Sequence, residues 1–426
     1  MRILLLSQVV PYPPDSGPKI KTYGVLRYLA RRHEVHLVSF VRSAGEEANA
    51  QGLRDLCASI TPVPLRRSRL ADVGYLARSL ATWRPFLIER DDSRAMREAV
   101  AEVVGRHAFD AVHADQLPLA QFAVDLPVPL RVLDEHNAVW TIVRRAAERE
   151  GLGPRRALAE LEWRKLRAYE GAICRRFDRV AVVSEQDHAA LVEAAGADLP
   201  VAVIPIAVDT RELAFAPRSP EARHVVSVAT MYYPPNVDGV RWFATRVFPL
   251  VRREAPQTRF YVVGSRPPGQ ISRLAGPDSG VVVTGYVADL EPVFRQSAVV
   301  VVPVHSGSGM RVKILEAFAR GIPVVSTTVG VEGLAARDGE HLLVADEPGE
   351  FARAVIRLLA EPAKAARLAR AGRELVEARY DWRTALSGLD RVYRPGGEAR
   401  PELPAAAAPR VEGGAASAGR GRASGI

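Results

Sequence analysis

The sequence predicts an α/β protein made of two doubly wound domains, each with a parallel β-sheet. Its 426 residues exceed the usual length of one domain, so two domains are expected. Short apolar runs of strand length alternate with longer amphipathic stretches, which is typical of buried parallel strands joined by helices. With 48% apolar and 25% charged residues, the composition excludes wholesale disorder and a coiled-coil rod.

The first half begins with a βαβ unit, because residues 3–6 read as a strand, residues 20–31 as a helix and residues 35–40 as a second strand. Three more apolar runs predict further parallel strands, at residues 111–113, 130–133 and 180–183. We expect this first domain to cover residues 1–208 and to be completed by a helix near residues 379–393.

After an apolar run at residues 201–208 the alternation restarts, which predicts a second parallel α/β domain over residues 209–378 with a hinge near residues 209–218. Its expected strands are residues 225–229, 260–263, 281–283, 299–302, 324–326 and 342–344, and its clearest helices are residues 237–253 and 310–320. Residues 395–426 contain almost no large apolar side chain, so they are expected to form a disordered tail.

The net charge of +9 favours an acidic partner, such as anionic lipid, a nucleotide or nucleic acid, without choosing among them. Residues 144–179 hold eleven Arg or Lys against six Asp or Glu, and this window is either a solvated helical face or a surface that rests on anionic lipid. No apolar run reaches the length of a bilayer span. Two cysteines, Cys57 and Cys174, are too few for a disulfide framework and are consistent with a reducing cytosol.

Residues 305–327 form the most informative segment. Gly307, Ser308 and Gly309 follow a predicted strand and precede a predicted helix, so backbone N–H groups and the positive end of the helix point at one place. An anion, most simply a phosphate, fits such a place.

Charged side chains continue this pattern into the helix. Arg311 and Lys313 are expected in its first turn, where cations are unfavourable unless they face something negative, such as a diphosphate. Glu316 follows three residues later on nearly the same face, where its carboxylate could accept both hydroxyls of a ribose. The alternative is an ordinary Lys and Glu pair on an exposed helix.

This segment resembles the donor-site signature of glycosyltransferase family 4, whose members are retaining enzymes with the GT-B fold. Supporting similarities, spread over residues 1–393, are VAVIPIAVD at 201–209, VVSVATMYYPPN at 225–236, FYVVG at 260–264, VTGYVAD at 283–289 and DEHN at 134–137. The chain departs from the family where Ser308 takes the place of a glutamate eight positions before Glu316. Residues 204–209 are similar to the family's IPNGVD motif, but Ile206 and Ala207 replace its Asn and Gly. The Arg and Lys that the family usually has after the first strand of the second domain are absent from ATMYYPPN.

The resemblance implies roles for particular residues. Glu316 would bind the donor ribose, and Arg311 and Lys313 the diphosphate. The segment Gly307, Ser308, Gly309 and Met310 would hold sugar and phosphate. The loop at Tyr286 and Val287 would contact the base, and Gly17, in the loop after the first strand, would lie near the donor phosphate. No metal or cofactor is implied.

His136, in the DEHN stretch, matches a position where the family often has a histidine facing the cleft. Asp134, Glu135 and Asn137 surround it at the carboxyl end of a predicted parallel strand, where ligands bind in such sheets. We expect His136 to take part in catalysis with Arg311 and Lys313, although a lone histidine at a strand end can also be structural.

These expectations combine into a retaining, metal-independent hexosyltransferase that moves a sugar from a nucleoside diphosphate sugar to a lipid-linked or polysaccharide acceptor. We expect a cytoplasmic protein, peripheral on the anionic inner face of the cell membrane, without a nucleic-acid partner. Two alternatives stay open. One is a nucleotide-sugar 2-epimerase, and the other is a non-catalytic sugar-nucleotide binder, which the Ser308 replacement would suit.

Overall fold

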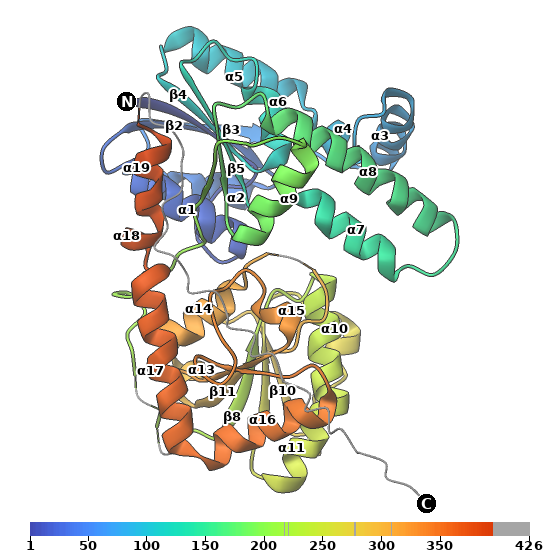
Figure 1. Ribbon diagram of the computed structural model, residues 1–426, viewed down its shortest axis with the longest axis vertical. Helices are drawn as coiled ribbons and strands as arrows, with labels where there is room; N and C mark the ends of the chain where they lie inside the picture. The colour runs from blue at the N-terminus through green and yellow to red at the C-terminus, as the bar shows by residue number, and fades with distance from the viewer. Residues whose placement is uncertain (217, 220, 277, 308, 395–426) are drawn as a thin grey trace, which may run out of the picture.

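In the computed structural model the chain forms two lobes, each built around one parallel β-sheet (Figure 1). The structure describes residues 1–216, 218–219, 221–276, 278–307 and 309–394. Ser308 and the expected tail at 395–426 therefore lie outside the described residues. The first sheet has the strand order β3-β2-β1-β4-β5-β6-β7, and the second β10-β9-β8-β11-β12-β13. The predicted fold class, two Rossmann-like parallel-sheet domains, is confirmed.

The first sheet is formed by β1 (Arg2–Ser7), β2 (Glu34–Val41), β3 (Ser59–Pro64), β4 (Ala111–Asp115), β5 (Leu130–Glu135), β6 (Arg179–Val182) and β7 (Val201–Val203). Its helices are α1 (Gly17–Leu29), α2 (Ala44–Ala50), α3 (Arg69–Thr82), α4 (Phe86–Asp91), α5 (Arg94–Arg106), α6 (Leu117–Ala123), α7 (Val139–Arg149), α8 (Pro154–Cys174) and α9 (Glu185–Ala195). The central strand β1 is a nearly continuous apolar run, and every residue of β4 is buried, as expected for a sheet covered on both faces.

The second sheet is formed by β8 (His224–Val228), β9 (Phe260–Val263), β10 (Val281–Gly285), β11 (Ser297–Val302), β12 (Val324–Ser326) and β13 (Leu343–Val344). Its helices are α10 (Pro234–Trp242), α11 (Phe248–Glu254), α12 (Gly269–Ser272), α13 (Glu291–Arg295), α14 (Val312–Ala319), α15 (Thr328–Val331), α16 (Pro348–Ala360) and α17 (Pro362–Arg379). The helix expected over 237–253 is interrupted by a π turn at Phe243–Val247, and Pro249, which has no amide hydrogen, follows that turn.

The end of the described chain returns to the first lobe, in the red helices at the left of Figure 1. These are α18 (Trp382–Ala385) and α19 (Leu389–Val392). Leu386, Leu389 and Tyr393 are buried in the same apolar cluster as Ile3 and Leu5 of β1. The C-terminal helices therefore contribute to the core beneath the first sheet.

The basic window at 144–179 forms most of α7 and α8, which project together from the first lobe (Figure 1). Leu166 is buried in the core, with Trp163 and Tyr169 packed against it, and Lys165 is only 2% exposed. These apolar side chains therefore pack into the first lobe, so they do not form a free apolar face for a bilayer. No helix in the described part of the chain combines the length and apolarity needed to cross a bilayer.

Candidate functional site

A glycine loop joins β11 to α14 and lies between the two lobes. Gly307 and Gly309 have φ angles of 90° and 85°, a region that glycine adopts without strain. A Cβ atom at Gly307 would lie 2.7 Å from the Tyr233 hydroxyl oxygen, and one at Gly309 would lie 2.1 Å from Asn137 Oδ1. Close packing and positive φ thus both require glycine at these two positions.

Lys313 lies in the first turn of α14, as predicted, whereas Arg311 precedes the helix, so its predicted place in that turn is wrong. Lys313 Nζ donates a hydrogen bond to Asn236 Oδ1 at 3.0 Å, and Arg311 Nη2 donates one to the Ser306 carbonyl at 3.3 Å. Burial, together with the nearby Arg311 charge, lowers the pKa of Lys313 from 10.5 to about 7. Two basic side chains are thus held beside the glycine loop, and the hydrogen-bond partner of Lys313 is a neutral amide.

Glu316 lies one turn further along α14. Burial raises the pKa of its carboxyl, and the charges of Arg320 and Lys313 oppose that rise. The carboxylate is therefore close enough to Lys313 for their charges to interact. Asn236, the hydrogen-bond partner of Lys313, was not singled out from the sequence, because only the fold brings α10 beside α14.

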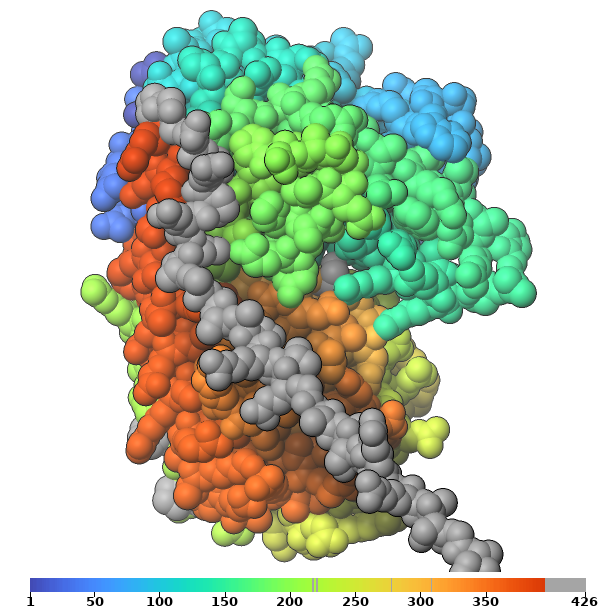
Figure 2. Space-filling view, in the orientation of Figure 1, coloured from blue at the N-terminus to red at the C-terminus, as the bar shows by residue number. Residues whose placement is uncertain are grey.

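The first lobe reaches the same loop from the other side. Arg145, on α7, donates a hydrogen bond to the Gly307 carbonyl at 3.1 Å and pairs with Glu332 at 2.6 Å. Arg149 donates to the His305 carbonyl. In Figure 2 the α7 and α8 pair overhangs the second lobe with a hollow beneath it. The sequence showed that the window at 144–179, which contains these arginines, is basic. It did not indicate that they would contact the second lobe.

Two other predicted residues border this loop. A Cβ atom at Gly17 would lie 3.9 Å from Val312 Cγ2, so the loop after β1 reaches the start of α14. Met310 is 7% exposed and belongs to an apolar cluster that also includes Val312. The structure thus brings Gly17, Met310 and the glycine loop together.

Tyr286 and Val287 follow β10. The Tyr286 side chain is 67% exposed, whereas Val287 packs against the apolar cluster that contains Met310 and Val312. Val287 therefore places this loop on the side of the second lobe that carries α14.

His136 follows β5 at the carboxyl edge of the first sheet. It is 6% exposed, and its Nε2 lies 3.0 Å from Asp115 Oδ1. Together with Glu135 and Asn137, His136 lines a cavity of about 210 Å³. Since Asn137 also contacts Gly309, His136 stands one residue from the contact between the lobes.

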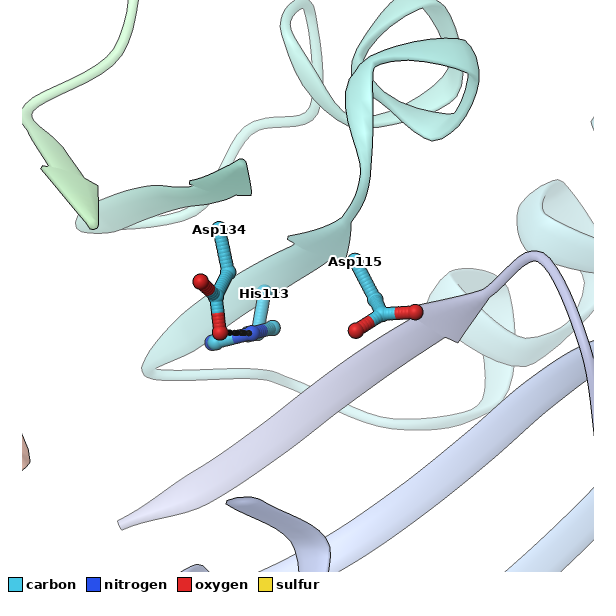
Figure 3. Close-up of side chains that lie close together, drawn as sticks. All are labelled: His113, Asp115 and Asp134. Atoms are coloured by element: carbon cyan, nitrogen blue, oxygen red, sulfur yellow. Dashed lines mark ion pairs between the residues drawn. The ribbon is translucent and has the colours of Figure 1, made fainter. Parts of the chain in front are cut away.

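His113, Asp115 and Asp134 form a buried group of titratable side chains (Figure 3), and Asp115 joins this group to His136. The Lys21 ammonium is 3.4 Å from Asp134 and donates to the Ile204 carbonyl at 2.8 Å. Burial alone would raise the pKa of Asp134, but Lys21 and the neighbouring histidines lower it below its ordinary value.

Other atoms of this group also have protein partners. Thr22 Oγ1 lies 3.0 Å from Asp115, and His113 Nδ1 lies 2.7 Å from the Tyr393 hydroxyl. The donor set could hold a metal ion by its chemistry, yet the Lys21 ammonium already supplies a positive charge there. We interpret the group as an ion-pair cluster that joins α1, β4, β5 and the C-terminal segment.

Comparison with known families matches two consecutive stretches of the chain. Residues 21–212 match the family described as Glycosyltransferase Family 4, and residues 222–361 match Glycosyl transferases group 1. Together these matches take in most of the chain.

Curated relatives align over shorter stretches. A D-inositol 3-phosphate glycosyltransferase of Rhodococcus opacus is 35% identical over 161 residues, which is 34% of this chain and 35% of that protein. An uncharacterized 44.6 kDa protein from the cps region of Klebsiella pneumoniae is 26% identical over 140 residues, which is 31% of this chain and 36% of that protein. The chain thus matches about a third of the length of these two relatives.

Solved structures share the whole fold at low identity. A sucrose-phosphate synthase from Thermosynechococcus elongatus has a TM-score of 0.66 at 19% identity, covering 92% of this chain and 98% of that one. HepE from Anabaena, solved in complex with UDP and glucose, has a TM-score of 0.65 at 17% identity over the same shares. The chain belongs to the group 1 glycosyltransferases with a first domain of the Glycosyltransferase Family 4 type, and its fold is GT-B.

Proposed function

We propose that the protein moves a hexose from a nucleoside diphosphate sugar to a lipid-linked or polysaccharide acceptor, with retention of configuration at the sugar. The observation that carries this proposal is the buried Lys313 ammonium beside Arg311 and the glycine loop, where a diphosphate would supply the missing negative charge. D-inositol 3-phosphate glycosyltransferases among the relatives and a UDP complex among the structural neighbours support it.

In the proposed reaction, the bond between sugar C1 and the β-phosphate oxygen breaks, and the nucleoside diphosphate leaves with the bonding electrons. An acceptor hydroxyl oxygen bonds to C1 and passes its proton to the leaving phosphate oxygen. Negative charge grows on the leaving phosphate, and Lys313 and Arg311 stabilise it together with backbone N–H groups of the glycine loop, Met310 included. Because these cations belong to the chain, the proposed chemistry uses no metal or cofactor.

The remaining predicted residues take the parts that the family resemblance gives them. Glu316 accepts the ribose hydroxyls, the exposed ring of Tyr286 and the neighbouring Val287 face the base, and Gly17 leaves room beside the phosphates. His136 faces the reacting sugar from the first lobe. Ser308 is proposed to contact the sugar, although it lies outside the described residues.

Replacing Glu316 with glutamine is expected to weaken binding of the bare nucleoside diphosphate about five- to tenfold, because a neutral amide accepts weaker hydrogen bonds than a carboxylate. Calorimetric titration measures this change. Glu350→Gln, at an exposed position on α16, is the matched control and should bind like the wild type. Equal affinity in Glu316→Gln and wild type would remove Glu316 from the ribose site.

Nucleotide binding should also take up a proton above neutral pH. The pKa of Lys313 is about 7 in the free protein, so most molecules carry a neutral amine at pH 8, and a bound diphosphate raises that pKa. Titration in two buffers of different ionisation enthalpy should reveal an uptake approaching about one proton at pH 8 and little at pH 6. Lys313→Arg, which stays charged, should show none, and equal uptake in that variant would assign the proton elsewhere.

A transfer assay tests the activity. Purified protein is incubated with UDP, GDP, ADP and dTDP sugars, with and without lipid-linked and glycan acceptors, and released nucleotide and sugar products are identified. Acceptor-dependent transfer supports the proposal. Release of a 2-epimer without acceptor would instead support an epimerase, and donor binding without turnover would support a non-catalytic binder.

We further propose that the protein works on the cytoplasmic face of the membrane through α3, not through the basic window on α7 and α8. Four large apolar side chains lie on one side of α3 and at its C-cap: Leu70, Val73, Leu80 and Trp83, with exposed fractions of 87%, 67%, 50% and 60%. Arg66 and Arg69 are exposed at its start. An apolar stripe beside basic residues is typical of helices that bind anionic bilayer surfaces.

Vesicle flotation tests this membrane contact. The wild type should float with vesicles of phosphatidylglycerol and phosphatidylcholine, and less so as salt rises, because screening weakens the arginine contribution. Leu70→Ser combined with Trp83→Ser should abolish flotation. Leu152→Ser removes an equally exposed leucine outside α3 and should float normally. Unchanged flotation of the α3 variant would contradict the proposed surface.

A further inference from the structure

The cavity beside His136 holds a concentration of positive charge that the donor site does not use. It opens at the carboxyl ends of several parallel strands of the first sheet. Its lining residues are Gln8, Arg42, Arg67, Leu87, Arg90, Asp91, Gln116, Pro118, Glu135, His136, Asn137 and Val139. We refer to it as the arginine pocket, after Arg42, Arg67 and Arg90.

The three arginines come from separate segments. Arg42 follows β2, Arg67 lies between β3 and α3, and Arg90 is in α4. Arg42 Nη2 donates to the Gln8 carbonyl at 3.0 Å, which holds that guanidinium at the end of β1. Only the parallel arrangement of the strands brings these segments to one opening.

One carboxylate orients two of these guanidinium groups. Asp91, with a side chain that is 0% exposed, lies 2.6 Å from Arg67 Nη2 and 3.4 Å from Arg90 Nε, and it accepts a hydrogen bond from Gln8 Nε2 at 2.9 Å. The Arg67 and Arg90 side chains remain 36% and 25% exposed. Asp91 therefore fixes two arginines while leaving them accessible to a ligand.

The charges in the pocket do not balance. Glu135 is the other lining carboxyl, and its pKa is raised well above the ordinary value by burial and by the Glu170 and Asp134 charges. Even with both carboxyls counted as charged, Asp91 and Glu135 are two against three guanidinium groups, and the environment of Glu135 disfavours its charged form. Guanidinium groups bind phosphates and carboxylates through paired N–H donors, so an oxyanion is the ligand that this surplus favours.

The position of the pocket fits an acceptor site. Asn137 lines the arginine pocket and also packs against Gly309 of the glycine loop. A group held by the arginines would therefore lie next to the part of the second lobe where the donor sugar is proposed to bind.

We propose that the arginine pocket binds the acceptor through an oxyanion, either a phosphate or a carboxylate, on or next to the sugar unit that receives the new residue. This proposal rests on the proposed glycosyltransferase function and narrows its acceptor to an anionic one. The acceptor's charge, and not its hydroxyl pattern alone, then selects it.

Calorimetric titration of the full chain with glucose 6-phosphate, glucuronate and glucose tests the pocket. At least one anionic sugar should bind at least tenfold more tightly than glucose, and the stronger of the two identifies phosphate or carboxylate as the recognised group. Arg67→Gln and Arg90→Gln should each weaken that binding at least fivefold. Arg94→Gln, at a 91% exposed position on α5, is the matched control and should change nothing.

Two outcomes overturn the proposal: anionic sugars that bind no better than glucose, or Arg67→Gln and Arg90→Gln variants that bind them like the wild type. Each variant is also titrated with the nucleoside diphosphate that the wild type binds. Retained nucleotide binding with lost sugar binding assigns the effect to the arginine pocket. Absence of nucleotide binding in the wild type would count against the glycosyltransferase function, separately from the result for anionic sugars.

Discussion

Lys313→Ala is expected to lower kcat/KM for sugar transfer about 100- to 1000-fold, the usual loss when one positioned donor to a developing negative charge is removed. Lys313 is buried, donates a hydrogen bond to the Asn236 amide oxygen and is close to Arg311, and among the described residues no carboxylate lies within ion-pair distance of its ammonium. Arg311→Ala should lose a similar factor, because the two cations share the phosphates.

The measurement is the steady-state release of nucleoside diphosphate in the presence of acceptor. Lys364→Ala, a half-buried lysine in the first turn of α17, is the matched control and should keep the wild-type rate. Lys313 and Arg311 carry like charges that repel each other, so removing Lys313 should cost little folding stability. Urea unfolding of Lys313→Ala should therefore give a free energy close to the wild-type value. Wild-type kcat/KM in folded Lys313→Ala would exclude this lysine from the reaction.

Asp134→Asn is expected to destabilise the protein by about 3–5 kcal/mol, because it leaves the Lys21 ammonium buried without its partner carboxylate. Both side chains are 0% exposed and 3.4 Å apart. Because the pKa of Asp134 is lowered in the folded protein, its carboxylate contributes fully to the free energy of unfolding above the unfolded-state pKa of about 3.9. This stabilisation is lost only as the pH falls through the folded-state pKa. At pH 7 the whole effect should therefore be measurable.

Urea unfolding of Asp134→Asn, Lys21→Met and the double variant measures this interaction. Each single variant should lose several kcal/mol, and the double variant clearly less than the two losses combined, since neither charge is then left unpaired. Asp238→Asn makes the same change in an exposed ion pair with Arg241 and should cost less than about 1 kcal/mol. A loss as small as this in Asp134→Asn would contradict the ion-pair interpretation.

Most strands and the glycine loop could be predicted because they depend on local patterns. Buried strands such as β1 and β11 are short apolar runs, and Gly307 and Gly309 occupy positions with positive φ between a strand and a helix. The strand β3, with Pro62 and Pro64, was not predicted, since proline argues against a strand. It is tolerated because β3 lies at the edge of the sheet, where an amide donor can be absent.

What escaped prediction depends on contacts between distant segments. Nothing in the sequence indicated that Asn236 would bind Lys313, or that Arg145 would reach Gly307 across the lobes. His136 was singled out because ligands bind at the carboxyl ends of parallel strands, and the same reasoning applies to Arg42 after β2. It could not reach Arg67, because the strand β3 that precedes Arg67 was not predicted. The sequence likewise shows that residues 144–179 are basic, but not which of these side chains are buried or paired. Lys165, for example, is buried and forms an ion pair with Glu162.

The most direct test of the donor site is calorimetric titration of the full chain with UDP, GDP, ADP and dTDP. The proposed site predicts that at least one of them binds in a one-to-one complex, that Lys313→Ala weakens this binding at least tenfold, and that Lys364→Ala does not. Failure of all four nucleotides to bind, or equal binding by Lys313→Ala and the wild type, would contradict a nucleoside diphosphate site at the start of α14.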